Sequence, residues 1–271
     1  MDEATKLLAC GAGAGLAAVY NVPLGGMLYI MEVLLCTFNW SVLIPALTTC
    51  AIAVVISWIG LGNAPLYNIP DLNISYSLVI WSILAGPVFG YVAYWFIWVA
   101  NKARLHSHHN WHMLLVCFIN FTLIGFLAIY FPALLGNGKS PAEMEFDDLD
   151  YFVGVELSLI LLVLRMLICW SSLGSGAQGG LLTPSLANGA LLAVVLGGLW
   201  NLLWPGTSFS AFAIIGSVAF VAAAQKMPIT AIVLIFELTR IKFNFLIPIM
   251  FAVSGSVGIS TLCMKICSQK K

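Results

Sequence analysis

Charged residues are missing from three long stretches of this chain. None falls between Glu32 and Asp71, between Asp71 and Lys102, or between Arg165 and Lys226. Each gap exceeds the roughly 20 residues that cross the hydrocarbon core of a bilayer as a helix. Only 8% of the 271 residues are charged and 61% are apolar, whereas about 25% of an ordinary soluble domain is charged. The sequence therefore predicts a multi-pass integral protein of the cell membrane, in contact with the lipid bilayer.

The apolar runs predict an all-α fold in which Gly and Pro positions break helices inside the membrane. The expected helices cover residues 2–20, a short segment from 23 to about 35, and residues 42–59, 76–105, 113–131, 155–170, 181–204, 211–224, 229–238 and 245–266. Several of these are too short to span a bilayer alone. Broken backbone is tolerated in a membrane only where protein or water covers it, so we expect the short helices to lie within a bundle.

Neither the cysteines nor the histidines form a metal-ligand pattern. The seven cysteines occur singly, without CxxC spacing, which is typical of small core residues. The four histidines, His106, His108, His109 and His112, crowd one loop that contains no Cys or acid. That arrangement favours a solvated cluster over a zinc site. We therefore expect no metal and no cofactor.

Two further classes of function are disfavoured by what the chain lacks. The net charge is zero and no basic run occurs, so no nucleic acid is expected as a partner. No nucleophile and base pair, metal-ligand set or phosphate loop is recognisable, which argues against an enzyme.

An internal repeat relates residues 11–32 to residues 216–237 at an offset of 205 positions. The identical residues are Gly11, Ala14, Ala17, Ala18, Pro23, Ile30 and Glu32, which match Gly216, Ala219, Ala222, Ala223, Pro228, Ile235 and Glu237. In both copies a helix of small residues runs into a proline, and an acid follows nine residues later. Such repeats are typical of transporters and channels whose halves are related by a pseudo-two-fold axis.

Glu32 and Glu237 are acids within apolar helices. An acid is expensive in hydrocarbon, so each is expected to face the bundle interior and bond a backbone amide, a partner or water. The simplest interpretation is a hydrogen-bonded or protonated glutamate that ties two helices together.

A glycine-rich segment, GSGAQGGLLTP at residues 174–184, precedes the helix expected from residue 181. Its glycines allow a sharp turn, and Pro184 is tolerated in a first helical turn. The unpaired N–H groups and the positive dipole end of such a helix form a site for an anion. Because conduction requires weak binding, backbone donors suit this task better than an arginine.

The same offset predicts that the counterpart of Pro184 lies about 20 residues before Met1. We therefore expect the chain to be the C-terminal portion of a longer, N-terminally truncated protein. On this interpretation residues 1–62 are the remaining end of a first repeat, residues 63–75 a connecting loop, and residues 76–271 a second repeat.

Three blocks resemble the CLC family of chloride channels and proton/chloride antiporters. They are GAGAGLAAVYNVPLGGMLYIME (11–32), SGAQGGLLTP (175–184) and AAAQKMPITAIVLIFELT (222–239). The resemblance covers nearly the whole chain and implies an inverted-repeat helical bundle with broken and tilted helices. It further implies that backbone amides of Leu181 and Leu182, flanked by Gly180 and Thr183, bind chloride. Leu182 stands where the family usually has phenylalanine.

Several family features are absent. The family's serine-bearing loop and gating glutamate precede the first block, and its chloride-binding tyrosine follows the last helix, whereas no tyrosine occurs here after Tyr151. The family's antiporters carry a proton-transfer acid ten residues after the proline of the first block, where this chain has Val33 beside Glu32. The resemblance therefore implies chloride transport that is channel-like, without proton coupling.

Alternatives remain open at this point. One is an inactive or split fragment that needs upstream helices, and another is a proton/chloride antiporter. An unrelated inverted-repeat transporter for an amino acid or sodium is disfavoured by the match at residues 175–184. The resemblance also implies a homodimer, in contact through helices near residues 42–59 and 212–247.

Overall fold

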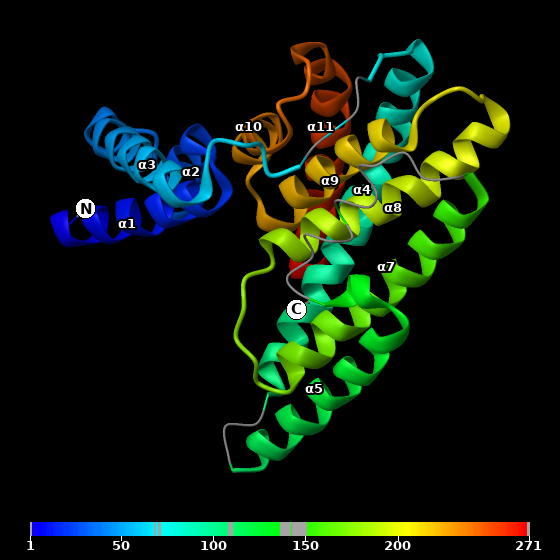
Figure 1. The fold of residues 1–271 in the computed structure, drawn as a ribbon, viewed down its shortest axis with the longest axis horizontal. Coiled ribbons are helices and arrows are strands. Elements are labelled where there is room, and N and C mark those ends of the chain that lie inside the picture. Colours follow the sequence, from blue (N-terminus) through cyan, green and yellow to red (C-terminus); the bar gives the residue numbers. More distant parts are fainter. Residues whose placement is uncertain are drawn as a thin grey trace.

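The computed structural model of the protein describes residues 2–67, 69, 72–107, 111–135, 142 and 151–269, in which every regular element is a helix (Figure 1). The α-helices are α1 (Glu3–Tyr20), α2 (Pro23–Tyr29), α3 (Trp40–Leu61), α4 (Tyr76–Leu105), α5 (His112–Tyr130), α7 (Tyr151–Gly174), α8 (Leu182–Leu203), α9 (Phe209–Gln225), α10 (Pro228–Thr239) and α11 (Leu246–Gln269). Short segments of other helix types are η1 (Ile30–Leu34), η2 (Pro132–Leu134) and η3 (Phe243–Phe245). The prediction of an all-α membrane fold is confirmed.

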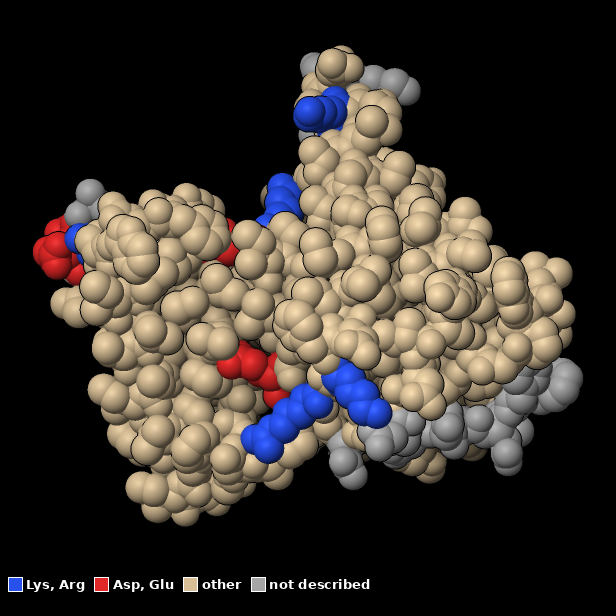
Figure 2. Space-filling view, turned by 90° about the horizontal axis from the view of Figure 1, so that it is seen from above, with Lys and Arg blue, Asp and Glu red and all other residues tan. Residues whose placement is uncertain are grey.

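Six helices among the described residues are long and apolar enough to cross a membrane. By length and composition they are Trp40–Leu61, Tyr76–Leu105, Met113–Tyr130, Gly154–Gly174, Leu182–Leu203 and Phe243–Gln269. Three shorter apolar helices, Pro23–Leu34, Phe209–Gln225 and Pro228–Thr239, are too short for this. Figure 2 shows a surface that is mostly uncharged, with Lys, Arg, Asp and Glu in a few small clusters. Such a surface suits hydrocarbon rather than water.

The helices form two packed groups that meet at α2 and α10 (Figure 1). Helices α1 and α3, with α2 and η1, enclose a small core that includes Ala17, Ile30 and Val54. The later helices enclose a larger core around α9, which is buried from Phe209 to Ala224. Helices α4, α8 and α11 pack around α9. Helix α9 is therefore surrounded by other helices of the protein. It does not contact lipid, and so it does not have to be long enough to span the bilayer.

Close packing of α8 against α9 depends on glycine. A Cβ added to Gly189 would lie 2.6 Å from the carbonyl oxygen of Gly216 and 2.6 Å from Cβ of Phe220. A Cβ added to Gly216 would lie 2.3 Å from Cβ of Ala193. Small residues at helix crossings let the backbones approach closely in membrane proteins. The small residues of this repeat block therefore serve packing.

The breaks in the longest charge-free stretch fall at its glycines. Between Arg165 and Lys226 the chain completes α7, forms α8 and α9, and turns twice. Gly176 and Gly206 have φ of 97° and 110° at these turns, which is left-handed backbone that glycine adopts without strain. The expectation that glycines mark breaks is confirmed at these positions.

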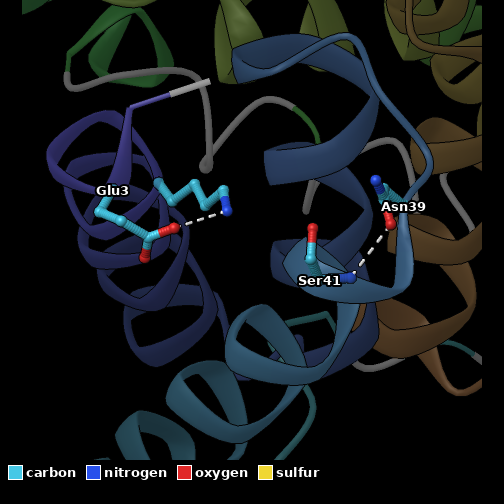
Figure 3. Close-up of polar contacts among 4 residues, drawn as sticks. Glu3, Asn39 and Ser41 are labelled. Carbon is cyan, nitrogen blue, oxygen red and sulfur yellow. Dashed lines mark hydrogen bonds and ion pairs between the residues drawn. The ribbon is translucent and has the colours of Figure 1, made fainter.

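Local polar contacts define some of the helix starts. The side chain of Asn39 accepts a hydrogen bond from the N–H of Ser41 at 3.2 Å and caps α3 (Figure 3). Asn and Ser are favoured caps because their side chains satisfy otherwise unpaired N–H groups.

In α1, the ammonium of Lys6 donates to Glu3 at 2.8 Å (Figure 3). This contact lowers the pKa of the exposed Glu3 carboxyl.

The segment after Pro23 differs from the expected single helix. The α-helix ends at Tyr29, and residues Ile30–Leu34 continue as a π-helix, with the N–H of Leu35 donating to Ile30 O at 2.9 Å. A π-helical turn bonds residues five apart and is often found at functional positions. Glu32 lies within this turn. The corresponding helix of the second copy, α10, is a regular α-helix.

Candidate functional site

The turn that precedes α8 is set by glycines and by hydrogen bonds at the end of α7. The N–H groups of Ser175 and Ala177 donate to the carbonyls of Ser171 and Ser172 at 2.8 and 3.1 Å. Gly176, at positive φ, lies so close to Met113 that a Cβ would approach its Cε to 2.7 Å. Another residue here would therefore strain the turn.

The first turn of α8 presents backbone N–H groups that have no partner. Leu181 is the N-cap residue and supplies no side-chain cap, and the first intrahelical bond is from Ser185 N to Leu181 O at 3.0 Å. No hydrogen bond joins the N–H of Gly180, Leu181, Leu182 or Thr183 to another described residue. Free N–H groups and the helix dipole together favour an anion at this point.

The four predicted site residues differ in exposure. Gly180 is exposed and Leu182 half-buried, whereas Leu181 and Thr183 are buried. The chain therefore passes from the surface into the protein over these four positions. This suits a site that an ion reaches from one side.

A cation lies near the turn that leads to α8. The guanidinium of Arg104, in the last turn of α4, donates to Gly179 O at 3.0 Å. Arg104 and residues Gly176 to Gly179 line a hollow of about 480 Å³. A positive charge here attracts anions without touching the backbone donors of Leu181 and Leu182.

Two helix ends from different parts of the chain contact the first turn of α8. Tyr20 ends α1, and its hydroxyl lies 2.8 Å from Oγ1 of Thr183. Gln225 ends α9, and its amide donates to Oγ of Ser185 at 3.5 Å. Tyr20 and Gln225 are related by the repeat offset of 205. Sequence reasoning missed both residues, although they lie at equivalent positions within the repeat of residues 11–32 and 216–237.

Glu32 caps the start of α10. Its Oε1 accepts from the N–H of Ile229 at 3.1 Å, and its Oε2 accepts from the N–H and the hydroxyl of Thr230 at 2.7 and 2.6 Å. Pro228 occupies the first helical position and has no N–H. The carboxylate therefore binds the first two N–H groups that α10 offers.

Glu237 makes the mirrored contact with the start of α2. Its Oε1 accepts from the N–H of Leu24 at 3.0 Å, and its Oε2 from the N–H of Gly25 at 2.6 Å. Leu24 and Gly25 precede Ile229 and Thr230 by 205 positions, the repeat offset. Each copy of the repeat thus holds the helix start of the other, through negative charge at a positive dipole end.

The turns before these helices are also equivalent. Asn21 and Lys226 are the C-cap residues of α1 and α9, and both adopt the left-handed conformation, with φ of 57° and 56°.

Val33, next to Glu32, is half-buried and packs against the larger core. Val33 offers no titratable group, so an acid for proton transfer is not present at that position.

Metal ligands do not gather in the part of the chain described. No group of three or more His, Cys, Asp and Glu residues within it could hold an ion. His108 and His109 lie outside the described residues. The free cysteines are spread over five helices and the stretch before α3.

These features are typical of the fold of membrane proteins built on inverted repeats. The chain belongs to the voltage gated chloride channel family, whose sequence model, described as "Voltage gated chloride channel", matches residues 1–261. The predicted family resemblance is confirmed.

Two curated relatives are each 30% identical to this chain over most of its length. The "H(+)/Cl(-) exchange transporter ClcA" of Vibrio vulnificus is 30% identical over 280 residues, an alignment that covers 99% of this chain and 58% of the relative. The "Voltage-gated ClC-type chloride channel ClcB" of Citrobacter koseri is 30% identical over 250 residues, which cover 88% of this chain and 58% of the relative. The chain thus spans little more than half the length of these relatives.

Solved structures share the fold. A slow cyanobacterial Cl⁻/H⁺ antiporter superposes with a TM-score of 0.84 at 24% identity, over 95% of this chain and 61% of the other. A CLC-type fluoride/proton antiporter gives a TM-score of 0.76 at 21% identity, over 94% of this chain and 62% of the other. These likenesses establish the bundle of broken helices that the sequence predicted.

Proposed function

We propose that the chain forms part of a protein that moves chloride across the membrane, with the anion held at the start of α8. The observation that carries this proposal is the set of unpaired N–H groups at Gly180, Leu181, Leu182 and Thr183. They lie where the chain passes from the surface into the protein. Such donors bind a small anion without a full positive charge, so the anion can also leave.

The replacement of phenylalanine by Leu182 is compatible with this proposal. The proposed ligand is the backbone N–H of Leu182, and its side chain is half-buried against the larger core. A change from one apolar side chain to another leaves the backbone donor in place. Arg104, bound to Gly179 O, supports the proposal by placing a positive charge beside the approach.

Exchange with protons is the form of transport that the relatives favour. Channel-like transport without proton coupling was expected from Val33 alone, and the comparisons do not support that expectation. ClcA of Vibrio vulnificus is named an exchange transporter, and two structures with the same fold are described as antiporters. We therefore adopt the proton/chloride antiporter alternative, in which Val33 does not carry the proton.

A flux experiment on the purified chain tests both parts. Liposomes that contain the chain and internal potassium chloride are diluted into chloride-free medium with valinomycin, which lets K⁺ leave and balance the charge. Chloride and pH are recorded in the same vessel. We expect chloride efflux together with alkalinisation of the medium, because protons enter as chloride leaves. Efflux without alkalinisation would return the channel-like interpretation.

If no efflux is seen, either the chain binds chloride but cannot transport it alone, or it has no chloride site at α8. Chloride binding measured by calorimetry on the same preparation separates these two cases. Binding without efflux would support the alternative of a fragment that needs further helices for transport. No binding and no efflux would refute the site at α8.

We also propose a homodimer, but with a smaller surface than the sequence suggested. Residues 212–224 of α9 are buried within one subunit, so they are not available to a partner. Helix α3 instead exposes apolar side chains such as Ile52, Ile56 and Ile59, and Ile229 and Ile247 are exposed beyond α9. Exposed apolar surface of this kind suits either lipid or a second copy.

A further inference from the structure

Two hydroxyl groups meet at the first turn of α8. The phenol oxygen of Tyr20 and Oγ1 of Thr183 are 2.8 Å apart, although the residues are 163 positions apart in the chain. Thr183 is 7% exposed and Tyr20 is half-buried. The contact joins the end of α1 to the helix start that carries the proposed anion site.

The hydrogens of this pair leave one donor uncommitted. Tyr20 and Thr183 each carry one O–H, and a single hydrogen bond between them uses one of the two. Neither hydroxyl bonds any other described residue. Whichever oxygen donates, the other hydroxyl keeps a hydrogen that has no acceptor within the described residues.

The groups around that hydrogen are also donors. The backbone N–H groups of Leu181, Leu182 and Thr183 are unpaired at the same turn. Among the described residues no acceptor is bonded to these N–H groups or to the remaining O–H, and a buried donor without an acceptor costs free energy. An excess of O–H and N–H donors in one place is satisfied by an anion.

We propose that the Tyr20–Thr183 hydroxyl pair is an anion ligand and that it sets which anion is preferred, an inference that rests on the proposed site at α8. A fixed, neutral O–H donor favours a small anion that accepts hydrogen bonds strongly, such as chloride. A large anion that accepts weakly, such as thiocyanate, gains less from it. The pair therefore raises the ratio of chloride to thiocyanate affinity.

The test removes each hydroxyl while keeping the side-chain shape. Tyr20→Phe, Thr183→Val and the double variant are compared with the unaltered chain, by calorimetric titration of sodium chloride and sodium thiocyanate in detergent. Thr183→Ser keeps the hydroxyl, and Tyr29→Phe alters a half-buried tyrosine whose hydroxyl bonds no described residue. The melting temperature of every variant is recorded alongside.

We expect the double variant, which removes both O–H donors, to raise the Kd for chloride about tenfold, the scale of one hydrogen bond to a charged group. The Kd for thiocyanate should rise much less. Each single variant should weaken chloride binding less than the double variant does, because the remaining hydroxyl keeps an O–H that can still donate to the anion. Thr183→Ser, which keeps a hydroxyl, should bind chloride more tightly than Thr183→Val, and Tyr29→Phe should bind as the unaltered chain does.

The outcomes that overturn the inference differ from those that overturn the site. If the unaltered chain binds no chloride, the site at α8 fails and the inference with it. If it binds chloride and the variant that lacks both hydroxyls binds it equally well, only the inference fails. Equal weakening of both anions with a lowered melting temperature would assign the pair to structure and would also overturn the inference.

Discussion

The carboxylates of Glu32 and Glu237 each bind the helix start of the other repeat copy. Removing either charge should therefore destabilise the protein, and the two variants can be compared with each other. Replacing Glu32 by glutamine keeps the size of the side chain but removes its charge and one acceptor oxygen. The Glu32 carboxylate accepts two backbone N–H groups of α10 and the hydroxyl of Thr230. A glutamine carbonyl can face one of the two N–H groups, whereas its NH₂ group would face the other.

The expected cost follows from the bonds that are lost. A hydrogen bond to a charged group contributes about 1.5–3 kcal/mol, and the interaction of a charge with a helix terminus adds about 0.3–1 kcal/mol. Both glutamates are half-buried, so we take the lower part of the sum. Glu32→Gln should lower the free energy of unfolding by roughly 2 kcal/mol.

Glu237→Gln should cost a similar amount, since Glu237 accepts the corresponding two N–H groups of α2. For chains of this size, roughly 2 kcal/mol corresponds to a melting temperature lower by about 4–8 °C. The measurement is thermal unfolding of the purified chain in detergent, followed by tryptophan fluorescence. Glu156→Gln is the control, because Glu156 is exposed in α7 and makes no hydrogen bond with described residues.

The equivalent contacts of Glu32 and Glu237 with two helix starts can be tested against each other. If Glu32→Gln and Glu237→Gln both melt with the unaltered chain and with Glu156→Gln, the carboxylates do not hold the helix starts. If only one variant is destabilised, the contact is not reciprocal and the equivalence of α2 and α10 is lost.

Two further outcomes are expected. Gly189→Ala should lower the free energy of unfolding by about 1–3 kcal/mol through overpacking, because its Cβ would press on the backbone of Gly216. Gly258→Ala is its control in α11, where nothing lies within 4 Å, and equal melting temperatures for the two variants would contradict the packing argument. In a background whose seven native cysteines are replaced by serine, a homodimer should appear as a crosslinked pair when Ile56→Cys, exposed in α3, is oxidised in detergent. Leu115→Cys, exposed in α5, should give none. A monomer in both cases would argue against a dimer through α3.

Much of the fold could be predicted because its signals are local. Charge-free stretches longer than a bilayer crossing predict membrane helices without knowledge of their packing. The turn at Gly176 was predicted because glycine and a following proline restrict backbone conformation within a few residues. The π-helical turn at Ile30–Leu34 was not predicted, since no residue type marks it.

The internal repeat predicted that two distant segments have equivalent structures, which local signals cannot predict. Matching Glu32 with Glu237 and Pro23 with Pro228 indicated two equivalent helix pairs before any contact was known. It did not say that each glutamate binds the other copy. A single sequence carries no information on which helices face one another.

Composition and spacing thus determined that the chain is helical, lies in a membrane, repeats itself and begins a helix near residue 181 after a glycine-rich turn. Only the tertiary structure decided that Glu32 reaches α10, that Glu237 reaches α2, and that Tyr20 meets Thr183. The physical reason is that helix formation follows from neighbouring residues, whereas these contacts join residues 163 to 212 positions apart. Their geometry exists only once the two groups of helices have packed.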